Sequence, residues 1–157
     1  MTNRAATGNQ LPSLLVFISL VALVAVFGAQ FEPGAWYAQL RKPDWNPPNR
    51  VFGPVWTVLY VGVAVAGWLV WRETRRVGPA LQLWGLQLIA NGLWSWLFFG
   101  LHRPGLALID IALLFCLIVS FIVVSRRNSV VASWLFVPYA IWVGFAAALN
   151  GWIWRAN

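Results

Sequence analysis

The chain has few of the residues on which most catalytic and metal sites depend. Its 157 residues include one cysteine, one histidine, and only four aspartates and glutamates. The single cysteine, Cys116, excludes an intrachain disulfide, and His102 has no second histidine or cysteine nearby with which to share a metal ion. No glycine-rich phosphate loop, serine nucleophile motif or carboxylate pair occurs. The sequence therefore predicts no metal site and no conventional catalytic centre.

Charge of either sign is also scarce. Charged residues form 10% of the chain, hydrophobic residues form 61%, and the mean hydropathy is +0.71. A typical soluble domain has about 25% charged residues, so this composition predicts an integral, multi-pass membrane protein. The net charge of +7 comes from lysines and arginines in short connections between apolar runs. We attribute them to anionic headgroups and membrane topology, and expect no nucleic-acid partner.

Five apolar runs are long enough to cross a bilayer, for which a helix needs about 20 residues. The predicted spans are residues 11–31, 52–71, 79–101, 105–125 and 130–154. We therefore predict an all-α, five-helix membrane bundle as a single domain over residues 11–157, after a short polar tail at 1–10. Pro138 lies inside the fifth run and should kink that helix. Lysines and arginines are nearly balanced between the two sides. If the first loop is set aside, they favour an N-terminus inside.

The one long connection, residues 32–50, is expected to be structured. It contains Trp36, Tyr37 and Trp45 together with Pro43, Pro47 and Pro48, which restrict the backbone. One interpretation is an interfacial segment lying on the headgroups. We favour the other, a lid packed over one end of the bundle.

Tryptophan is abundant, with 12 residues in the chain. Some lie near the ends of apolar runs, where an indole suits the lipid–water boundary: Trp68, Trp71, Trp84, Trp134, Trp152 and Trp154. Others lie deeper, where a buried N–H needs a partner: Trp56, Trp94, Trp96 and Trp142. The one acidic residue within a span is Asp110, which we expect to reach water or Arg103 rather than to have a role of its own.

Aromatic and polar side chains share one face on three of the predicted spans. Residues three or four apart lie on the same helical face, and the sets are Gln87, Asn91, Trp94 and Phe98; Trp56 and Tyr60; and Tyr139, Trp142, Ala146 and Asn150. Lipid offers the amides of Gln87 and Asn91 no partner, so they should face protein or a cavity. The pattern favours a cavity for a large flat ligand; interhelical hydrogen bonding is the alternative.

An ordered set of short motifs resembles one known family. The motifs are WYAQLRKPDWNPP at residues 36–48, PVWTVLY at 54–60, NGLW at 91–94, VPYAIW at 137–142 and LN at 149–150. In this order, across five spans, the chain resembles the TspO/MBR family of tryptophan-rich sensory proteins and translocator proteins. The match covers nearly the whole chain beyond the first ten residues.

The resemblance implies a five-helix bundle, often a homodimer, that binds porphyrins and in some members sterols, with the first loop closing the cavity. It implies that Trp56 and Trp142 face each other across the cavity, that Asn91 belongs to its wall, and that Tyr60 and Trp45 shape it. The expected ligand-binding residues are Trp36, Tyr37, Trp45, Trp56, Tyr60, Gln87, Asn91, Trp94, Phe98, Tyr139, Trp142 and Ala146. No cofactor is required, the porphyrin being the ligand, and the expected location is a bacterial membrane.

The function expected from the residues and the resemblance is a membrane-embedded porphyrin or tetrapyrrole binder that acts as a sensor or handler. Three alternatives remain open. One is an enzyme that degrades porphyrin with light and oxygen, in which Trp56 and Trp142 take part in the redox step. Another is a lipid or sterol transporter, although the stretch at 149–155 lacks the tyrosine of the vertebrate cholesterol pattern. The last is a purely structural partner protein.

Overall fold

The computed structural model describes residues 10–31 and 33–157, so the predicted polar tail lies outside the described residues except for Gln10. Within that part of the chain the structure is helical and has no strand. Its elements are α1 (Leu11–Ala29), α2 (Ala35–Gln39), α3 (Asn49–Thr74), α4 (Pro79–Ser95), the π-helical turn η1 (Trp96–Gly100), α5 (Pro104–Ser125), α6 (Val130–Leu135) and α7 (Val137–Ala156). The all-α prediction is confirmed.

Among the described residues, four helical stretches are long and apolar enough to cross a membrane: α1, α3, α5 and the stretch Val130–Ala156 that α6 and α7 form together. The predicted third span differs from these. It consists of α4, with 17 residues, and of η1, which follows it directly for five more. The chain thus stays helical from Pro79 to Gly100, with a change of helix type near its end. The architecture is that of an integral membrane helical bundle.

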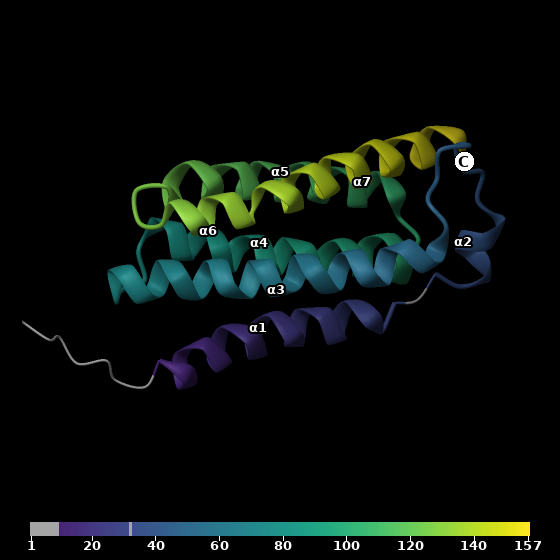
Figure 1. The fold of residues 1–157 in the computed structure, drawn as a ribbon. Helices are drawn as coiled ribbons and strands as arrows, with labels where there is room; N and C mark the ends of the chain where they lie inside the picture. Colours follow the sequence, from purple (N-terminus) through teal and green to yellow (C-terminus); the bar gives the residue numbers. More distant parts are fainter. Residues whose placement is uncertain (1–9, 32) are drawn as a thin grey trace, which may run out of the picture.

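The helices pack side by side along one long axis (Figure 1). Helix α1 packs against α3 and α4, α4 packs against α5, and α5 packs against α7, while α3 contacts α6. Short α2 and the C-terminus lie at one end of the bundle, and the α3–α4 and α5–α6 connections lie at the other. The connections that follow α3, η1 and α5 are short, so the helices they join run antiparallel.

The predicted kink in the fifth span appears as a break. Helix α6 ends at Leu135, Phe136 separates the two helices, and α7 begins at Val137. Pro138 therefore lies in the first turn of α7, where its missing N–H removes no intrahelical hydrogen bond. The prediction that Pro138 interrupts this span is confirmed, and the interruption falls two residues before the proline.

The outer surface of the bundle is apolar. Val58, Ile89, Ile109 and Ile141 are each 68% exposed or more, as expected for side chains that face lipid. Trp84 departs from its predicted place at the lipid–water boundary, because it is 4% exposed and its N–H donates to the Val63 carbonyl at 2.8 Å. The indole fits there because Gly67 of α3 has no side chain: a Cβ at Gly67 would lie 2.4 Å from Trp84 Cε2.

Candidate functional site: an aromatic cavity beneath the first loop

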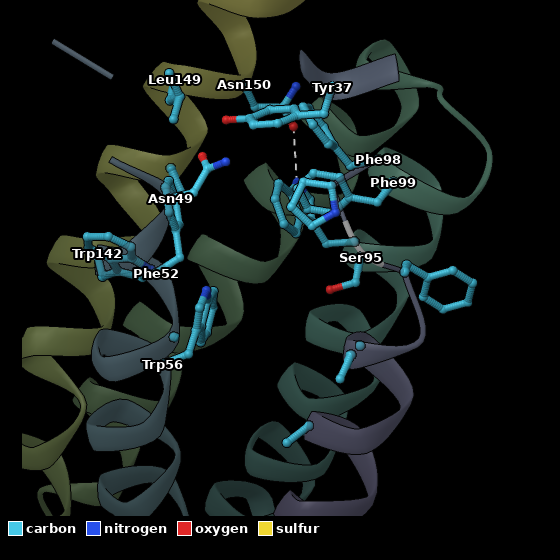
Figure 2. A pocket seen from close by; sticks show the side chains of 18 of the residues that line it. Tyr37, Asn49, Phe52, Trp56, Ser95, Phe98, Phe99, Trp142, Leu149 and Asn150 are labelled. Atoms are coloured by element: carbon cyan, nitrogen blue, oxygen red, sulfur yellow. Dashed lines mark hydrogen bonds between the residues drawn. The ribbon is translucent and has the colours of Figure 1, made fainter. Parts of the chain in front are cut away.

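A cavity of about 360 Å³ lies at the end of the bundle that α2 covers (Figure 2). This volume falls within the roughly 300–1,000 Å³ of small-molecule sites. We call it the aromatic cavity. Its lining residues are Ala25, Gly28, Ala29, Phe31, Pro33, Tyr37, Asn49, Phe52, Gly53, Trp56, Tyr60, Trp94, Ser95, Phe98, Phe99, Trp142, Ala146, Leu149, Asn150 and Ile153.

The α3 wall is built from residues spaced four apart. Phe52, Trp56 and Tyr60 follow one another on one face of α3, as helical geometry dictates. The Trp56 and Tyr60 rings are stacked, with centroids 5.2 Å apart. Tyr60 is held further by its hydroxyl, which donates to Asn91 Oδ1 at 2.8 Å. The wall is therefore a continuous aromatic surface with a fixed orientation.

The α4 wall changes helix type where it meets the cavity. Trp94 stacks on Phe98 at 5.1 Å, and its N–H donates to Asn150 Oδ1 at 3.0 Å. Asn150 in turn donates to the Pro104 carbonyl at 2.8 Å, so α4, α7 and the start of α5 are linked. The π-helical turn η1 contains the consecutive residues Phe98 and Phe99, and both line the cavity. Turns of this kind occur often at functional sites.

On α7, Trp142 contributes a hydrogen-bond donor that no described residue accepts. Its Nε1 is buried and has no partner among the described residues. The indole packs edge-on against Phe52, with ring centroids 5.7 Å apart. Figure 2 shows Phe52, Trp56 and Trp142 together on the side of α3 and α7, with Ser95, Phe98 and Phe99 opposite. Trp142 thus lies on the same side of the cavity as Trp56, rather than across the cavity from it as the family resemblance implied.

The first loop covers this end of the bundle. Tyr37, in α2, is 6% exposed and packs edge-on against Phe98 and Phe99. Burial raises the pKa of the Tyr37 hydroxyl above its ordinary value, so it stays protonated and donates to Asn46 Oδ1 at 3.4 Å. The neighbouring Trp36 stacks on His102 at 4.2 Å, outside the cavity lining.

The same loop is tied to the C-terminus. The Arg41 N–H donates to Asn157 Oδ1 at 2.9 Å, and Asn157 Nδ2 donates to the Arg41 carbonyl at 3.2 Å. Trp45 lies away from the cavity, is 48% exposed, and packs edge-on against Phe145. The described part of the loop is therefore a packed cover, of which Tyr37 and Pro33 reach the cavity.

Three of the predicted binding residues form a buried hydrogen-bonded network instead of lining the cavity. Asn91 Nδ2 donates to the Tyr139 hydroxyl at 2.9 Å, and that hydroxyl donates to Gln87 Oε1 at 3.0 Å. With Tyr60, the network links α3, α4 and α7. The amides thus find their partners in neighbouring helices, which was the alternative to a ligand contact.

Of the residues expected to bind ligand, Tyr37, Trp56, Tyr60, Trp94, Phe98, Trp142 and Ala146 line the cavity, whereas Trp36, Trp45, Gln87, Asn91 and Tyr139 do not. The sequence analysis missed the α1 wall, where Ala25, Gly28 and Ala29 line the cavity. These small residues are spaced by three and four and so share one face, a signal that was present in the sequence. A Cβ at Gly28 would lie 3.3 Å from Ser95 Oγ, so α1 approaches α4 closely here.

Asp110 does not reach water or Arg103 as expected. It is 6% exposed, its Oδ2 has no hydrogen-bond partner among residues 10–31 and 33–157, and it does not line the aromatic cavity. The position of Asp110 along the fourth predicted span placed it near the membrane boundary. In the structure, the packing of α5 against α4 and α7 covers its side chain. Among the described residues, no group of three metal-ligating side chains occurs.

Comparisons with known proteins agree with this architecture. The sequence profile of the TspO/MBR family matches residues 15–155. The chain is 37% identical over 147 residues to protein CrtK of Rhodobacter capsulatus, covering 90% of this chain and 91% of that protein. It is 39% identical over 159 residues to the tryptophan-rich protein TspO of Chlorobaculum tepidum, covering 95% and 98%. It is also 37% identical over 137 residues to the human translocator protein, covering 83% and 81%. The family profile covers nearly the whole chain, and relatives in the family are 37–39% identical to it over more than 80% of its length, so the chain belongs to the TspO/MBR family.

Proposed function

We propose that the protein binds a porphyrin or a related flat tetrapyrrole in the aromatic cavity and acts as a membrane sensor or handler of that ligand. The observation that carries the proposal is the combination of the stacked rings of Trp56 and Tyr60 with the buried N–H of Trp142, which has no partner among the described residues. Flat conjugated ligands gain from stacking on aromatic faces. A buried donor without a partner costs free energy, which a ligand acceptor would recover.

Charge near the cavity supports a ligand that bears carboxylates. Arg41, within the lid, and Arg50, just after it at the start of α3, are exposed, and neither forms an ion pair within residues 10–31 and 33–157. A cavity of about 360 Å³ is at the small end of the usual range, so it would enclose part of a tetrapyrrole and leave an edge outside. Propionate groups on that edge would meet these guanidinium groups.

The test is to fill the cavity without disturbing the fold. Ala146 lines the cavity on α7, whereas Ala148 on the same helix is exposed. We expect Ala146→Phe to weaken protoporphyrin IX binding at least about tenfold, because the added ring takes up ligand space and overpacking costs roughly 1–3 kcal/mol. Affinity is measured from the shift of the porphyrin absorption band in detergent, which does not depend on tryptophan emission.

The matched control is Ala148→Phe, which should bind porphyrin like the wild type. Equal affinity in the two variants would mean that the porphyrin, if bound, lies elsewhere, and the proposed site would be wrong. Circular dichroism of both variants checks that they are folded.

A further inference from the structure

A second cavity lies at the opposite end of the bundle from the lid. It has a volume of about 260 Å³ and lies where the α3–α4 and α5–α6 connections meet. We call it the arginine cavity. Its lining residues are Val70, Thr74, Arg76, Gly78, Pro79, Ala80, Leu81, Val124, Arg127 and Asn128. This volume is below the roughly 300–1,000 Å³ of sites for drug-sized ligands, so the arginine cavity suits a smaller group than a tetrapyrrole.

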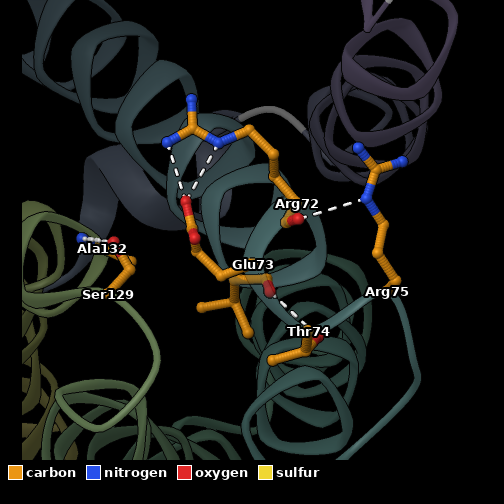
Figure 3. Close-up of polar contacts among 7 residues, drawn as sticks. Arg72, Glu73, Thr74, Arg75, Ser129 and Ala132 are labelled. Atoms are coloured by element: carbon orange, nitrogen blue, oxygen red, sulfur yellow. Dashed lines mark hydrogen bonds and ion pairs between the residues drawn. The ribbon is translucent and has the colours of Figure 1, made fainter. Parts of the chain in front are cut away.

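The two arginines of this cavity differ from their neighbours. Arg72 pairs with Glu73 at 2.9 Å, and Arg75 donates through Nε to the Arg72 carbonyl while lying over the Trp71 ring (Figure 3). Arg76 and Arg127, by contrast, form no ion pair or side-chain hydrogen bond within the part of the chain that the structure describes. The cavity therefore has two guanidinium groups available to an anion.

The start of α4 adds backbone donors on the same side. The N-cap residue Gly78 has an extended backbone (φ −103°, ψ −174°) and no side chain with which to cap the helix. Ala80 and Leu81, in the first turn, line the cavity. First-turn N–H groups have no intrahelical acceptor, and the helix dipole favours negative charge at this end.

Apart from Thr74 and Asn128, the remaining side chains of the lining are apolar, and they lie where the long helices end. Val70 and Val124 lie near the ends of α3 and α5, and Leu81 lies near the start of α4. All three are close in sequence to Arg76 or Arg127. A site with cationic groups at the boundary and an apolar wall toward the bilayer has the two-part character of a phospholipid. A free inorganic anion would gain no binding free energy from the apolar wall.

We propose that the arginine cavity binds the phosphate of an anionic phospholipid headgroup, held by Arg76, Arg127 and the first turn of α4. The acyl chains follow the apolar wall into the bilayer. The site is separate from the aromatic cavity, so the proposal does not rest on porphyrin binding.

The experiment uses the purified full chain in a neutral detergent and follows its unfolding temperature by circular dichroism. The probes are dioctanoyl phosphatidylglycerol, dioctanoyl phosphatidylcholine and inorganic phosphate, at matched concentration and ionic strength. Phosphatidylglycerol is expected to raise the unfolding temperature in a saturable way, because a ligand that binds the folded state stabilises it. Phosphatidylcholine and inorganic phosphate are expected to leave it nearly unchanged.

The decisive variants change Gly78, where an added Cβ would meet nothing within 4 Å. Asp and Asn are both good N-cap residues, so Gly78→Asp and Gly78→Asn should both fold. Only the carboxylate repels a phosphate. We expect Gly78→Asp to raise the half-saturating phosphatidylglycerol concentration at least about tenfold and Gly78→Asn to change it by less than about threefold.

A second pair of variants removes equal charge from the same end. Arg76→Gln with Arg127→Gln should abolish the saturable shift, whereas Arg75→Gln with Arg126→Gln, which do not line the cavity, should retain it. If both arginine pairs lose the saturable shift equally, or if the Gly78→Asp and Gly78→Asn variants have the same half-saturating concentration, the lipid is attracted by the overall positive charge. Either result overturns the proposed site. A full shift with phosphatidylcholine would assign the effect to the acyl chains, and a full shift with inorganic phosphate would assign it to a free anion. Either result also overturns the proposal.

Discussion

At the scale of single residues, hydrogen-bond satisfaction separates the tryptophans by role. The indoles of Trp84 and Trp94 donate to Val63 and Asn150, so their N–H groups hold helices together. The Nε1 of Trp142 is also buried, but it donates to nothing among the described residues. Buried donors normally have partners, so the proposed ligand is expected to place an acceptor at the Trp142 N–H.

We predict that Trp142→Phe weakens porphyrin binding by roughly three- to tenfold, about the worth of one hydrogen bond. Phenylalanine keeps an aromatic ring against Phe52 and removes the N–H. The measurement is a titration followed by porphyrin absorbance. Trp152→Phe is the control, because Trp152 is on the same helix, is 38% exposed and does not line the cavity. If both variants bind like the wild type, Trp142 does not donate to the ligand.

At the scale of elements, close helix contacts depend on where the small residues lie. Gly67 allows α3 and the Trp84 indole of α4 to meet, with Phe17 of α1 against the same point. The lid is held by side-chain packing and hydrogen bonds instead. Tyr37 of α2 packs against Phe98 of η1, and the Arg41 N–H that follows α2 donates to Asn157 Oδ1. Membrane helices are held largely by such packing, because lipid supplies no hydrophobic drive for association.

Two glycine substitutions should therefore have opposite effects on stability. Gly67→Ala places a Cβ 2.4 Å from the Trp84 ring, and we expect it to cost about 1–3 kcal/mol through overpacking. A Cβ at Gly85 on α4 would meet nothing within 4 Å, so Gly85→Ala should stabilise the helix by about 0.5–1 kcal/mol. Thermal unfolding in detergent, followed by circular dichroism, compares the two. A Gly67→Ala protein as stable as the Gly85→Ala protein would contradict the packing described.

At the scale of the whole molecule, the buried hydrogen-bonded network lies next to the aromatic cavity, and most of its members hold helices together rather than line the cavity. Tyr60 is its one member that also lines the aromatic cavity, while Asn91, Tyr139 and Gln87 join α3, α4 and α7 next to it. Below the lid, the bundle thus has a hydrogen-bonded centre, and the cavity lies between that centre and α2. The two cavities lie at opposite ends, one aromatic and one cationic.

We predict that Asn91→Ala destabilises the fold by about 1–2 kcal/mol, since it leaves the hydroxyls of Tyr60 and Tyr139 each short of a partner. Because Asn91 does not line the cavity, porphyrin affinity at a temperature where the variant is folded should change by less than about threefold. Asn128→Ala, at an exposed turn position, is the stability control. A large loss of affinity with unchanged stability would instead assign Asn91 to the ligand.

Hydropathy and periodicity in the sequence determine the membrane helices of this protein and several of the faces on which its aromatic residues lie. Long apolar runs with few charges require helices in a membrane, because lipid leaves backbone groups no other way to be satisfied. Residues four apart must share a helical face, so the pairing of Trp56 with Tyr60, and of Trp94 with Phe98, followed from spacing alone. The prolines and aromatics of residues 33–48 likewise indicated a packed cover.

Tertiary structure alone decided which of these faces meets a cavity and which meets another helix. A mid-membrane amide must have a partner, yet the sequence does not say whether that partner is a ligand or a neighbouring side chain. The rotation and crossing of α3, α4 and α7 set Asn91 and Gln87 against Tyr139, covered Asp110, and brought the small residues of α1 to the cavity wall. Those rotations depend on contacts between residues far apart in the chain, which local spacing does not encode.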